Sequence, residues 1–395
     1  ASIDPTERGP TLVWGAGAIG GTVGAHLVRA RHAVVFVDIV PDHVAAIADP
    51  ARGLAIEGPV AAFRIHAPAH TPETLRGTYR RVFLCVKTHD TEAACRALLP
   101  HLAPDGYVLS LQNGLCERVI AGVCGAHRTI GAFVNFGADW IEPGRVLYGN
   151  RGALVVGELD GAPTPRVMAL HALLRDTFEP DAVLTDNIWG YLWGKLAYSS
   201  LLYAQGLAER GIADTLARPE LLPLIRALCG EVIGEAEAAT GGPVGVLVCN
   251  AGGVRGQVMR PVEDVPEEDW HAIFDINTHA AFRLAKAVAP GMKRAGAGRI
   301  VTISSGAGIK ASRTGIQAYC AAKHALVGLT RQLSREFGPH GITVNSVAPG
   351  FVLSNPASIA QFESYGEAGK KAIVEGIAMR KLGAAEDIAN AVLFL

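Results

Sequence analysis

Short apolar runs alternate with amphipathic stretches over the first 160 residues of the chain. The runs predict strands at 11–14, 33–38, 82–86, 107–111, 129–134 and 153–157. Between several of them the spacing predicts helices, notably over 18–30 and 91–102. Parallel strands need crossover connections, and helices in those connections cover both faces of the sheet. The alternation therefore predicts an α/β fold with a doubly wound parallel sheet.

The pattern changes twice further along the chain. From about residue 187 to 240 it is wholly helical, with helices predicted over 187–208 and 219–240. From Val244 the alternation resumes, with strands at 244–249, 299–304 and 342–347 and helices at 267–294, 317–337 and 385–394. The join, residues 239–243, has the length of one turn rather than of a linker. The sequence thus predicts a sheet domain, a short helical segment and a second, partial α/β unit.

Composition excludes several classes of protein. The 395 residues carry a net charge of −1, which gives no electrostatic case for binding nucleic acid or an anionic membrane. No apolar run approaches the roughly 18 residues that span a bilayer, and the polar segment 1–10 lacks the core of a signal peptide. Seven scattered cysteines without a CxxC pair indicate reduced thiols, so we expect a cytoplasmic protein without a metal site.

A glycine-rich motif directly follows the first predicted strand and opens the first predicted helix. It reads Gly15-Ala16-Gly17-Ala18-Ile19-Gly20. In this context the first glycine permits a tight turn, the second lets the backbone approach a pyrophosphate, and the third lets the helix pack against the strand. The helix N-terminus then faces the phosphates. The motif predicts a dinucleotide site at Gly15, Gly17, Ala18, Ile19 and Gly20, against the alternative of a glycine turn without a ligand.

The expected cofactor is a nicotinamide dinucleotide, and Asp38 bears on which one. It ends the second predicted strand, 18 residues after Gly20. A carboxylate there can accept hydrogen bonds from both ribose hydroxyls and would repel a 2′-phosphate. Within NAD(P), Asp38 therefore favours NAD.

Three further motifs give the first half of the chain a family resemblance. They are Phe83-Leu84-Cys85-Val86-Lys87-Thr88, Leu111-Gln112-Asn113-Gly114 and Trp193-Gly194-Lys195-Leu196. With the glycine motif, they make residues 11–241 resemble the ketopantoate reductases (2-dehydropantoate 2-reductases). The resemblance implies a Rossmann fold in which Lys87 and Asn113 line the cofactor–substrate cleft and Lys195 protonates a ketone as hydride arrives. A cation there stabilises charge that develops only in the transition state; the alternative is a solvated helix lysine.

The first half also departs from that family. Ser199 and Tyr203 stand where the family has asparagines, one and two helical turns after its lysine. Asp38 disagrees with the family's usual preference for NADPH. The family's helical domain continues further, and its later serine and glutamate, which hold the substrate, have no counterpart here. We therefore expect a truncated substrate domain.

A second ordered series of motifs begins at Val244. It comprises Val246-Leu247-Val248-Cys249-Asn250-Ala251-Gly252, Asn277, Ile303-Ser304-Ser305, Tyr319 with Lys323, and Asn345-Ser346-Val347-Ala348-Pro349-Gly350. Residues 243–395 thereby resemble the short-chain dehydrogenase/reductase family. The resemblance implies that Asn250, Ala251 and Gly252 lie under the cofactor and that Pro349, Gly350 and Ser354 hold its carboxamide. It also implies that Asn277 supports a water leading to Lys323, which binds the nicotinamide ribose.

The spacing of the second series suits acid/base chemistry. Tyr319 and Lys323 stand at i and i+4, so they share one face of a helix. An ammonium near a phenol favours the phenolate, and the tyrosine can then exchange a proton near neutral pH. Ser305 ends a strand and could hold the substrate oxygen. The alternative is a helical Tyr and Lys near an unrelated serine.

Each half lacks what the other supplies. The short-chain family begins with its own glycine-rich turn, but helices precede Val244 here. Three strands of a seven-stranded sheet are therefore expected, and their unpaired edges favour a homo-oligomer. The predicted domains are a tail (1–10), a Rossmann domain (11–184), a truncated helical substrate domain (185–241) and a partial catalytic domain (242–395).

Both halves indicate an NAD(P)-dependent oxidoreductase that acts on a small ketone or alcohol. Turnover could run through Tyr319 with Ser305, Asn277 and Lys323, or through Lys195. The alternative is a dinucleotide-binding but catalytically idle chimera, because the splice falls inside both families' domains rather than between them. That boundary favours a recombined or artificially joined sequence over an evolved bifunctional enzyme. A composite active site shared by both halves is not expected.

Overall fold

The computed structural model describes residues 9–205, 222–240, 242–254, 257–312, 315–353 and 356–395. The chain divides into two compact units, Ala1–Leu202 and Tyr203–Leu395. Among the predicted site residues, Ser354 lies outside the described residues, as does the side chain of Tyr203.

Unit 1 (Ala1–Leu202) is built on an eight-stranded sheet in the order β12-β11-β8-β7-β6-β1-β2-β5. Its pairs are parallel except β8 with β11, which run antiparallel. The predicted doubly wound, mainly parallel sheet is thereby confirmed. The strands are β1 (Thr11–Trp14), β2 (Val34–Val37), β5 (Ala69–His70), β6 (Tyr79–Leu84), β7 (Leu102–Ser110), β8 (Thr129–Val134), β11 (Leu154–Glu158) and β12 (Val183–Leu184).

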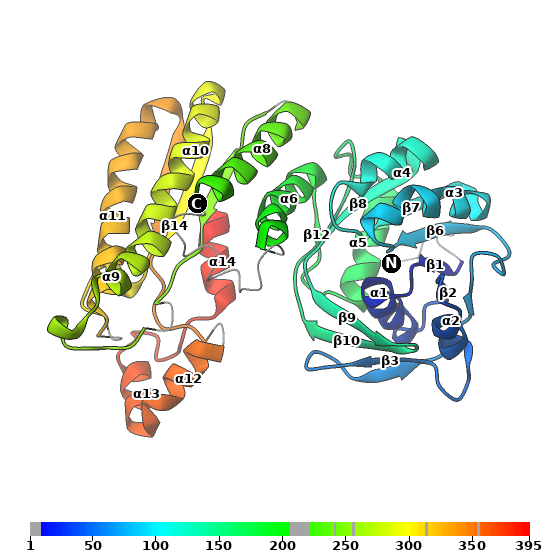
Figure 1. Ribbon diagram of the computed structural model, residues 1–395, viewed down its shortest axis with the longest axis horizontal. Coiled ribbons are helices and arrows are strands. Elements are labelled where there is room, and N and C mark those ends of the chain that lie inside the picture. Colours follow the sequence, from blue (N-terminus) through cyan, green and yellow to red (C-terminus); the bar gives the residue numbers. More distant parts are fainter. Residues whose placement is uncertain (1–8, 206–221, 241, 255–256, 313–314, 354–355) are drawn as a thin grey trace. The chain divides into compact units, whose positions relative to one another are not determined.

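A second sheet of four strands, β4-β3-β10-β9, forms a further layer of unit 1. These strands are β3 (Leu54–Glu57), β4 (Phe63–Ile65), β9 (Gly137–Glu142) and β10 (Arg145–Asn150). Helix α1 (Ala18–Arg29) contacts β1 and β2 on one side and all four strands of the second sheet on the other (Figure 1). The first helix of the glycine motif is therefore held between two sheets.

Alternate residues of the main sheet fill two cores, because successive side chains of a strand point to opposite faces. Val13, Phe36 and Phe83 join the core shared with α1 and the second sheet. Leu12, Trp14 and other strand residues join the core under α3 and α4. The remaining helices of unit 1 are α2 (Pro41–Ala48), α3 (Thr91–Leu98), α4 (Cys116–Cys124), α5 (Pro165–Thr177) and α6 (Ile188–Gln205), with short 3₁₀ turns at Thr88–Asp90, Leu99–His101 and Ala126–Arg128; α6 extends across the boundary between the units.

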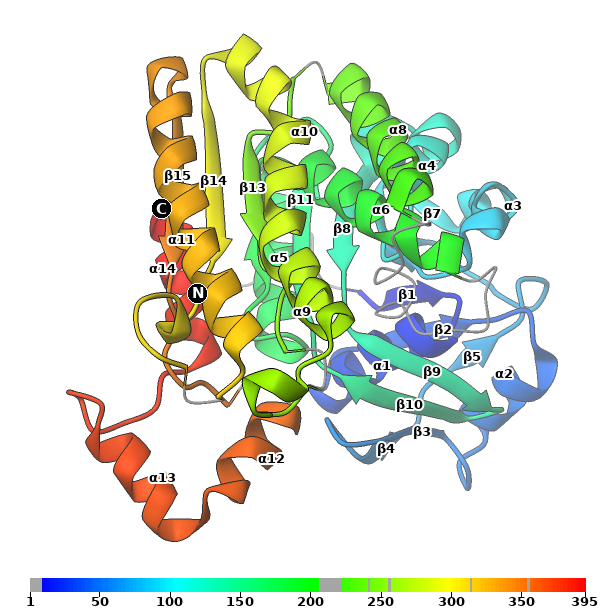
Figure 2. The ribbon, with the colours of Figure 1, turned by 60° about the vertical axis from the view of Figure 1, so that its left-hand side comes forward.

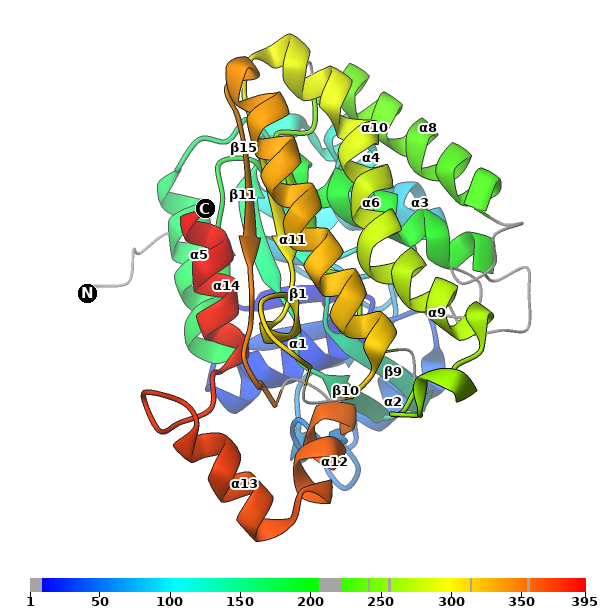
Figure 3. The ribbon, with the colours of Figure 1, turned by 90° about the vertical axis from the view of Figure 1, so that its left-hand side faces the viewer.

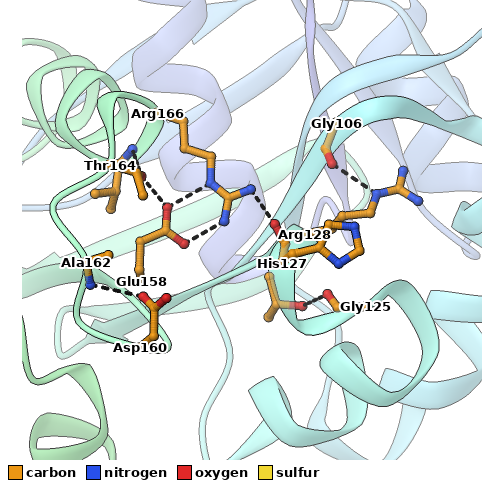
Figure 4. A network of polar contacts seen from close by, with 11 residues as sticks. Gly106, Gly125, His127, Arg128, Glu158, Asp160, Ala162, Thr164 and Arg166 are labelled. Atoms are coloured by element: carbon orange, nitrogen blue, oxygen red, sulfur yellow. Dashed lines mark hydrogen bonds and ion pairs between the residues drawn. The ribbon is translucent and has the colours of Figure 1, made fainter.

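An ion pair between the buried Glu158 and the partly exposed Arg166 fixes the start of α5 to the end of β11 (Figure 4). Glu158 is 4% exposed and accepts from Arg166 Nε at 2.7 Å and Arg166 Nη2 at 2.6 Å. Thr164 caps the helix by accepting from the Val167 N–H, and its hydroxyl also donates to Glu158. Arg166 Nη1 reaches the His127 carbonyl at 2.6 Å, so one guanidinium joins three segments of the chain.

The described part of unit 2 (Tyr203–Leu395) has a three-stranded parallel sheet in the order β13-β14-β15. The strands are β13 (Val246–Cys249), β14 (Gly298–Ile303) and β15 (Ile342–Val347). Helices α10 (Ala280–Ala295) and α11 (Gln317–Phe337) pack along this sheet (Figures 2 and 3). A partial second α/β unit is thereby confirmed.

The other helices of unit 2 follow the predicted pattern in part. The pattern predicts one helix over 267–294; the structure has α9 (Glu267–Phe274), a π-helical turn (Asp275–His279) and then α10. The unit also contains α8 (Leu222–Thr240), α12 (Pro356–Ser364), α13 (Gly366–Glu375) and α14 (Ala385–Phe394), with 3₁₀ turns at Val262–Asp264, Gly306–Gly308 and Gly338–His340. No described helix is both long and apolar enough to cross a membrane.

Candidate functional site

The glycine motif of unit 1 adopts the geometry that a dinucleotide cradle needs. Gly15 has φ +95°, and a Cβ there would lie 2.9 Å from the Cys85 carbonyl carbon. A Cβ on Gly20 would lie 2.0 Å from the Gly15 oxygen, so α1 could not approach β1 with any other residue. Gly17 instead faces open space, with no atom within 4 Å of an added Cβ. The residues present therefore fit a pyrophosphate at the N-terminus of α1, beside Ala18 and Ile19.

Asp38 lies directly after β2 and holds the glycine turn. Its Oδ2 accepts the Ala16 N–H at 2.8 Å, and its Oδ1 accepts the Val40 N–H at 3.0 Å. A carboxylate has about four lone-pair positions, so both oxygens can still accept from ribose hydroxyls. The side chain can position the turn and bind the ribose.

Two further loops of unit 1 meet at the carboxyl ends of β6 and β7. Lys87 is exposed just beyond β6, and Asn113 is exposed just beyond β7. The Thr88 hydroxyl donates to the Asn113 carbonyl at 2.9 Å and ties the loops together. Ligands of open parallel sheets bind at the carboxyl ends of the strands. These loops and the glycine turn thus share the edge of the sheet where a cofactor is expected.

Lys195, on α6, reaches the same edge. Its Nζ donates to Asn113 Oδ1 at 2.6 Å and to the Val134 carbonyl, and it lies 5.4 Å from the centre of the Phe133 ring. Partial burial lowers the pKa of Lys195 from its usual value. The structure therefore brings together Lys195 and Asn113, two of the residues predicted from separate motifs. Ser199, one turn further along α6, is partly buried.

A hollow of about 2010 Å³ lies elsewhere in unit 1. It is lined by Pro10, His32, Thr78 and other residues at the amino ends of β1, β2 and β6, the edge opposite the glycine turn. Several acidic and basic groups on its wall pair with one another, as in Arg166 with Glu158 and Arg80 with Asp105. Position and charge pairing both argue against this hollow as the cofactor site.

In unit 2 the predicted lysine and asparagine meet beneath the Asn250–Gly252 segment. Lys323 is 4% exposed, and its Nζ donates to the Ile303 carbonyl at 2.8 Å. A Cβ on Gly252 would lie 2.7 Å from Asn277 Oδ1 and 3.1 Å from Lys323 Nζ. Asn277 occupies the π-helical turn, accepts the Gly253 N–H at 3.0 Å and donates to the Gly253 carbonyl at 2.8 Å. This close approach accounts for the glycine.

Burial changes the pKa of the lysine beside the candidate tyrosine. It lowers the pKa of Lys323 to about 8, and Nζ lies 5.7 Å from the centre of the Tyr319 ring. Ser305 accepts the Ala307 N–H at 3.2 Å, and the Cys320 thiol donates to the Ala307 carbonyl at 3.4 Å. The loop after Ser305 therefore packs on the first turn of α11. Gly306 N–H donates to the Pro349 carbonyl at 2.8 Å, which joins that loop to Pro349-Gly350.

Sequence reasoning missed three polar groups that support these sites. His43 contacts the glycine turn, Ser304 donates to the Lys323 carbonyl at 3.1 Å, and Thr278 donates to the Ala322 carbonyl at 2.8 Å. Ser304 and Thr278 each adjoin a predicted site residue, but only the fold shows that both bond to the helix of Lys323. No described group of three or more His, Cys, Asp or Glu residues could hold a metal ion.

Unit 2 does not repeat the nucleotide cradle of unit 1. In its described part helix α8, rather than a glycine-rich turn, precedes β13. The three strands provide Asn250, Ala251 and Gly252 but no helix N-terminus aimed at phosphates by such a turn. The described residues of unit 2 therefore fit the nicotinamide end of a dinucleotide better than its pyrophosphate.

Comparison with known proteins finds two families, one for each half. Residues 11–161 match the family described as ketopantoate reductase PanE/ApbA. Residues 227–395 match the family described as enoyl-(acyl carrier protein) reductase. Both resemblances predicted from the motifs are confirmed.

Individual relatives and solved structures match part of the chain. The 3-oxoacyl-[acyl-carrier-protein] reductase of Rickettsia felis is 40% identical over 150 residues, which are 38% of this chain and 58% of the relative. That of Escherichia coli K12 is 38% identical over 204 residues, 51% of this chain and 75% of the relative. Among solved structures, 2-dehydropantoate 2-reductase from Geobacter metallireducens GS-15 matches with a TM-score of 0.52 and 28% identity, over 58% of this chain and 75% of that one.

Both halves thus match families of oxidoreductases that act on C=O or CH–OH groups. The chain belongs to the short-chain dehydrogenase/reductase family through its C-terminal part, and its N-terminal part has the sequence signature and fold of the ketopantoate reductases.

Proposed function

We propose that the chain is an NAD(H)-dependent oxidoreductase of a small ketone or alcohol, with the dinucleotide held by unit 1. The observation that carries this proposal is the contact of Lys195 Nζ with Asn113 Oδ1 at 2.6 Å, at the sheet edge that also carries the glycine turn. The predicted domains, a cofactor domain over 11–184, a helical segment over 185–241 and a catalytic segment over 242–395, form part of this proposal. We also propose that the chain forms a homo-oligomer.

In this proposal, residues of unit 1 bind the cofactor and transfer a proton to the substrate. When bound, a reduced nicotinamide supplies hydride to the carbonyl carbon. The backbone at Gly15, Gly17 and Gly20 and the N-terminus of α1 hold the pyrophosphate, and Asp38 accepts from the ribose. Asn113 orients the Lys195 ammonium. Lys195 donates a proton from Nζ to the carbonyl oxygen as negative charge develops there, and its lowered pKa makes it a stronger acid for that step.

A second candidate site uses Tyr319 in unit 2. The buried Lys323, with a pKa of about 8, beside the Tyr319 ring is the observation that favours it. In this alternative Tyr319 exchanges the proton, Ser305 holds the substrate oxygen, and Asn277 supports Lys323 from the π-helical turn. Asn250, Ala251, Gly252, Pro349, Gly350 and Ser354 would contact the nicotinamide end of the cofactor.

Replacing Lys195 tests the first candidate against the second. We expect Lys195→Met to lower the rate of ketone reduction by about 100-fold, the lower end of what a general acid contributes. Binding of NADH should change little, because the glycine turn and Asp38 are untouched. The measurement is single-turnover oxidation of NADH in the presence of a panel of small ketones, with NADH affinity from fluorescence titration.

The matched control is Lys286→Met, which removes an exposed lysine of α10 and should leave both quantities unchanged. Loss of turnover in Tyr319→Phe, with Lys195→Met unaffected, would assign the reaction to the second candidate. In the parent, NADH binding without reduction of any ketone in the panel would support the idle chimera.

The choice between cofactors is a separate prediction. We expect the parent to bind NADH at least tenfold more tightly than NADPH, because the Asp38 carboxylate repels a 2′-phosphate and loses its ribose partner. Titration of the full chain with each reduced cofactor measures the difference. Tighter binding of NADPH would refute the role given to Asp38.

A further inference from the structure

His43 is a fully buried polar residue close to the proposed cofactor site. It lies in α2, is 1% exposed, and contacts segments far away in the sequence. Its Nε2 lies 2.9 Å from the Ala16 carbonyl. Its Nδ1 accepts the Gly144 N–H at 2.9 Å and the Trp140 Nε1–H at 3.4 Å. Because two donors face Nδ1, the ring proton is on Nε2, which donates to Ala16.

The peptide group contacted by His43 belongs to the glycine turn. The Ala16 N–H is held by Asp38 and the Ala16 carbonyl by His43, so this residue is fixed from both sides. In a planar trans peptide the N–H of Gly17 points opposite to the Ala16 carbonyl. It therefore points away from His43, in a turn where the Gly17 Cα borders open space.

The second sheet holds the imidazole in place. Gly144 forms the turn between β9 and β10 with φ +82°, and Trp140 lies on β9 with its ring edge-on to His43 at 5.9 Å. The end of this hairpin reaches α2 (Figure 2). On α1, a Cβ added to Gly21 would lie 3.2 Å from Val146 of β10. The same hairpin thus backs the helix start directly and the glycine turn through His43.

We propose that His43 is a positioning residue that orients the Gly17 N–H toward the pyrophosphate of a bound dinucleotide. The proposal rests on the proposed dinucleotide site of unit 1. The first N–H groups of a helix have no intrahelical acceptor, and a phosphate is the anion they bind best when they are held toward it. His43 acts through the Ala16–Gly17 peptide and does not itself contact the ligand.

Binding of two probes that differ in the pyrophosphate tests this role. His43→Phe keeps a ring against Trp140 but removes every polar contact of His43. We expect its affinity for ADP-ribose to fall by about 10- to 100-fold, the value of one hydrogen bond to a charged group. Its affinity for adenosine, which has no phosphate, should not change. His43→Gln, which keeps a donor and an acceptor, should recover most of the loss. Calorimetry on the full chain measures the affinities of the parent and of both variants for each probe.

A second readout and a control separate positioning from general destabilisation. His26→Phe alters a partly buried histidine of the same unit, packed among Phe63, Tyr148 and Phe178, and should leave ADP-ribose affinity unchanged. In the folded parent, nitrogen NMR should show His43 protonated on Nε2. A proton on Nδ1 overturns the proposal even if His43→Phe does not fold.

Other outcomes also decide the matter. Equal ADP-ribose affinity in His43→Phe and the parent, or an equal loss for adenosine and ADP-ribose, overturns the role of His43 but leaves the proposed function standing. A parent that binds neither ADP-ribose nor NADH overturns both. A parent that binds ADP-ribose but reduces no ketone leaves the His43 proposal intact and contradicts only the activity.

Discussion

Arg166→Met is expected to lower the free energy of unfolding of unit 1 by about 3 kcal/mol, the lower end of the effect of breaking a buried ion pair, because Glu158 is buried but Arg166 is partly exposed. Glu158 is 4% exposed and takes two guanidinium hydrogen bonds, at 2.6 and 2.7 Å (Figure 4). Of the side-chain hydrogen bonds to Glu158 described above, only the one from the Thr164 hydroxyl remains without Arg166. The bond from Arg166 to the His127 carbonyl is lost as well.

The measurement is urea unfolding followed by tryptophan fluorescence. Trp14, Trp140, Trp189 and Trp193 lie in unit 1 and only Trp270 lies in unit 2, so the signal reports mainly on unit 1. The matched control is Arg96→Met, which breaks the exposed pair with Glu92 on α3 and should cost roughly 0.5 kcal/mol or less.

A double variant tests the physical reason. Adding Glu158→Gln to Arg166→Met removes the stranded charge, so the double variant should be more stable than Arg166→Met alone. If Arg166→Met and the double variant are equally destabilised, the loss comes from packing of the Arg166 stem rather than from an unpaired carboxylate.

The strands of the main sheet could be predicted from sequence because burial on both faces makes them continuous apolar runs. β1, β8 and β11 are buried along nearly their whole length and lie where the runs place them. β5 and β12 have two residues each, too few for any pattern, and they were missed. They extend the expected six strands to eight.

The second sheet could not be predicted for a different reason. β9 has no buried residue, and its sequence, Gly137–Glu142, has no apolar alternation. In the same sheet, β3 and β10 pair in parallel across 90 residues of chain, as in Arg145 with Ala55. Such pairing depends on the fold as a whole, so local periodicity does not reveal it.

In the candidate sites too, local patterns could be predicted from sequence and contacts between distant residues could not. Glycine spacing, a strand-end aspartate and a Tyr–Lys pair at i and i+4 are local patterns, and the sequence shows them directly. His43 stands alone in a short apolar helix, and its partners Ala16, Trp140 and Gly144 are 27, 97 and 101 residues away. A lone histidine in such a helix carries no signal until the fold brings those partners to it.

Glu117→Gln is expected to stabilise unit 1 at alkaline pH. Glu117 lies in the first turn of α4, is 0% exposed, and within the described residues neither of its carboxyl oxygens has a hydrogen-bond partner. Burial raises the pKa of Glu117 from 4.5 to about 7. The backbone N–H of Glu117 and, to a smaller extent, the Ser110 hydroxyl oppose this shift without outweighing it, although neither makes a hydrogen bond of normal geometry with the carboxyl group. The native state therefore keeps a proton that the unfolded chain has already released.

The sign of the pH dependence follows from this difference. Stability from the retained proton is fully present below pH 4.5 and is lost as the pH rises through about 7. A shift of this size corresponds to about 3 kcal/mol. Glutamine has a similar shape but does not ionise. The difference in free energy of unfolding between the variant and the parent should therefore shift in favour of the variant by up to about 3 kcal/mol between pH 4.5 and a pH above 7.

Urea unfolding of both proteins at pH 4.5, 6 and 8 measures this change. Any constant cost of burying an amide cancels, because only the change with pH is compared. Glu92→Gln, at an exposed position on the neighbouring α3, should show the pH dependence of the parent. Identical pH profiles for Glu117→Gln and the parent would mean that Glu117 ionises as easily in the native state as in the unfolded chain. If the free energy of unfolding of the parent falls as the pH rises and that of Glu117→Gln falls less, Glu117 is a protonated, unpaired carboxyl in the native state. It lies four residues after Asn113, at the start of α4, which follows the proposed cofactor cleft.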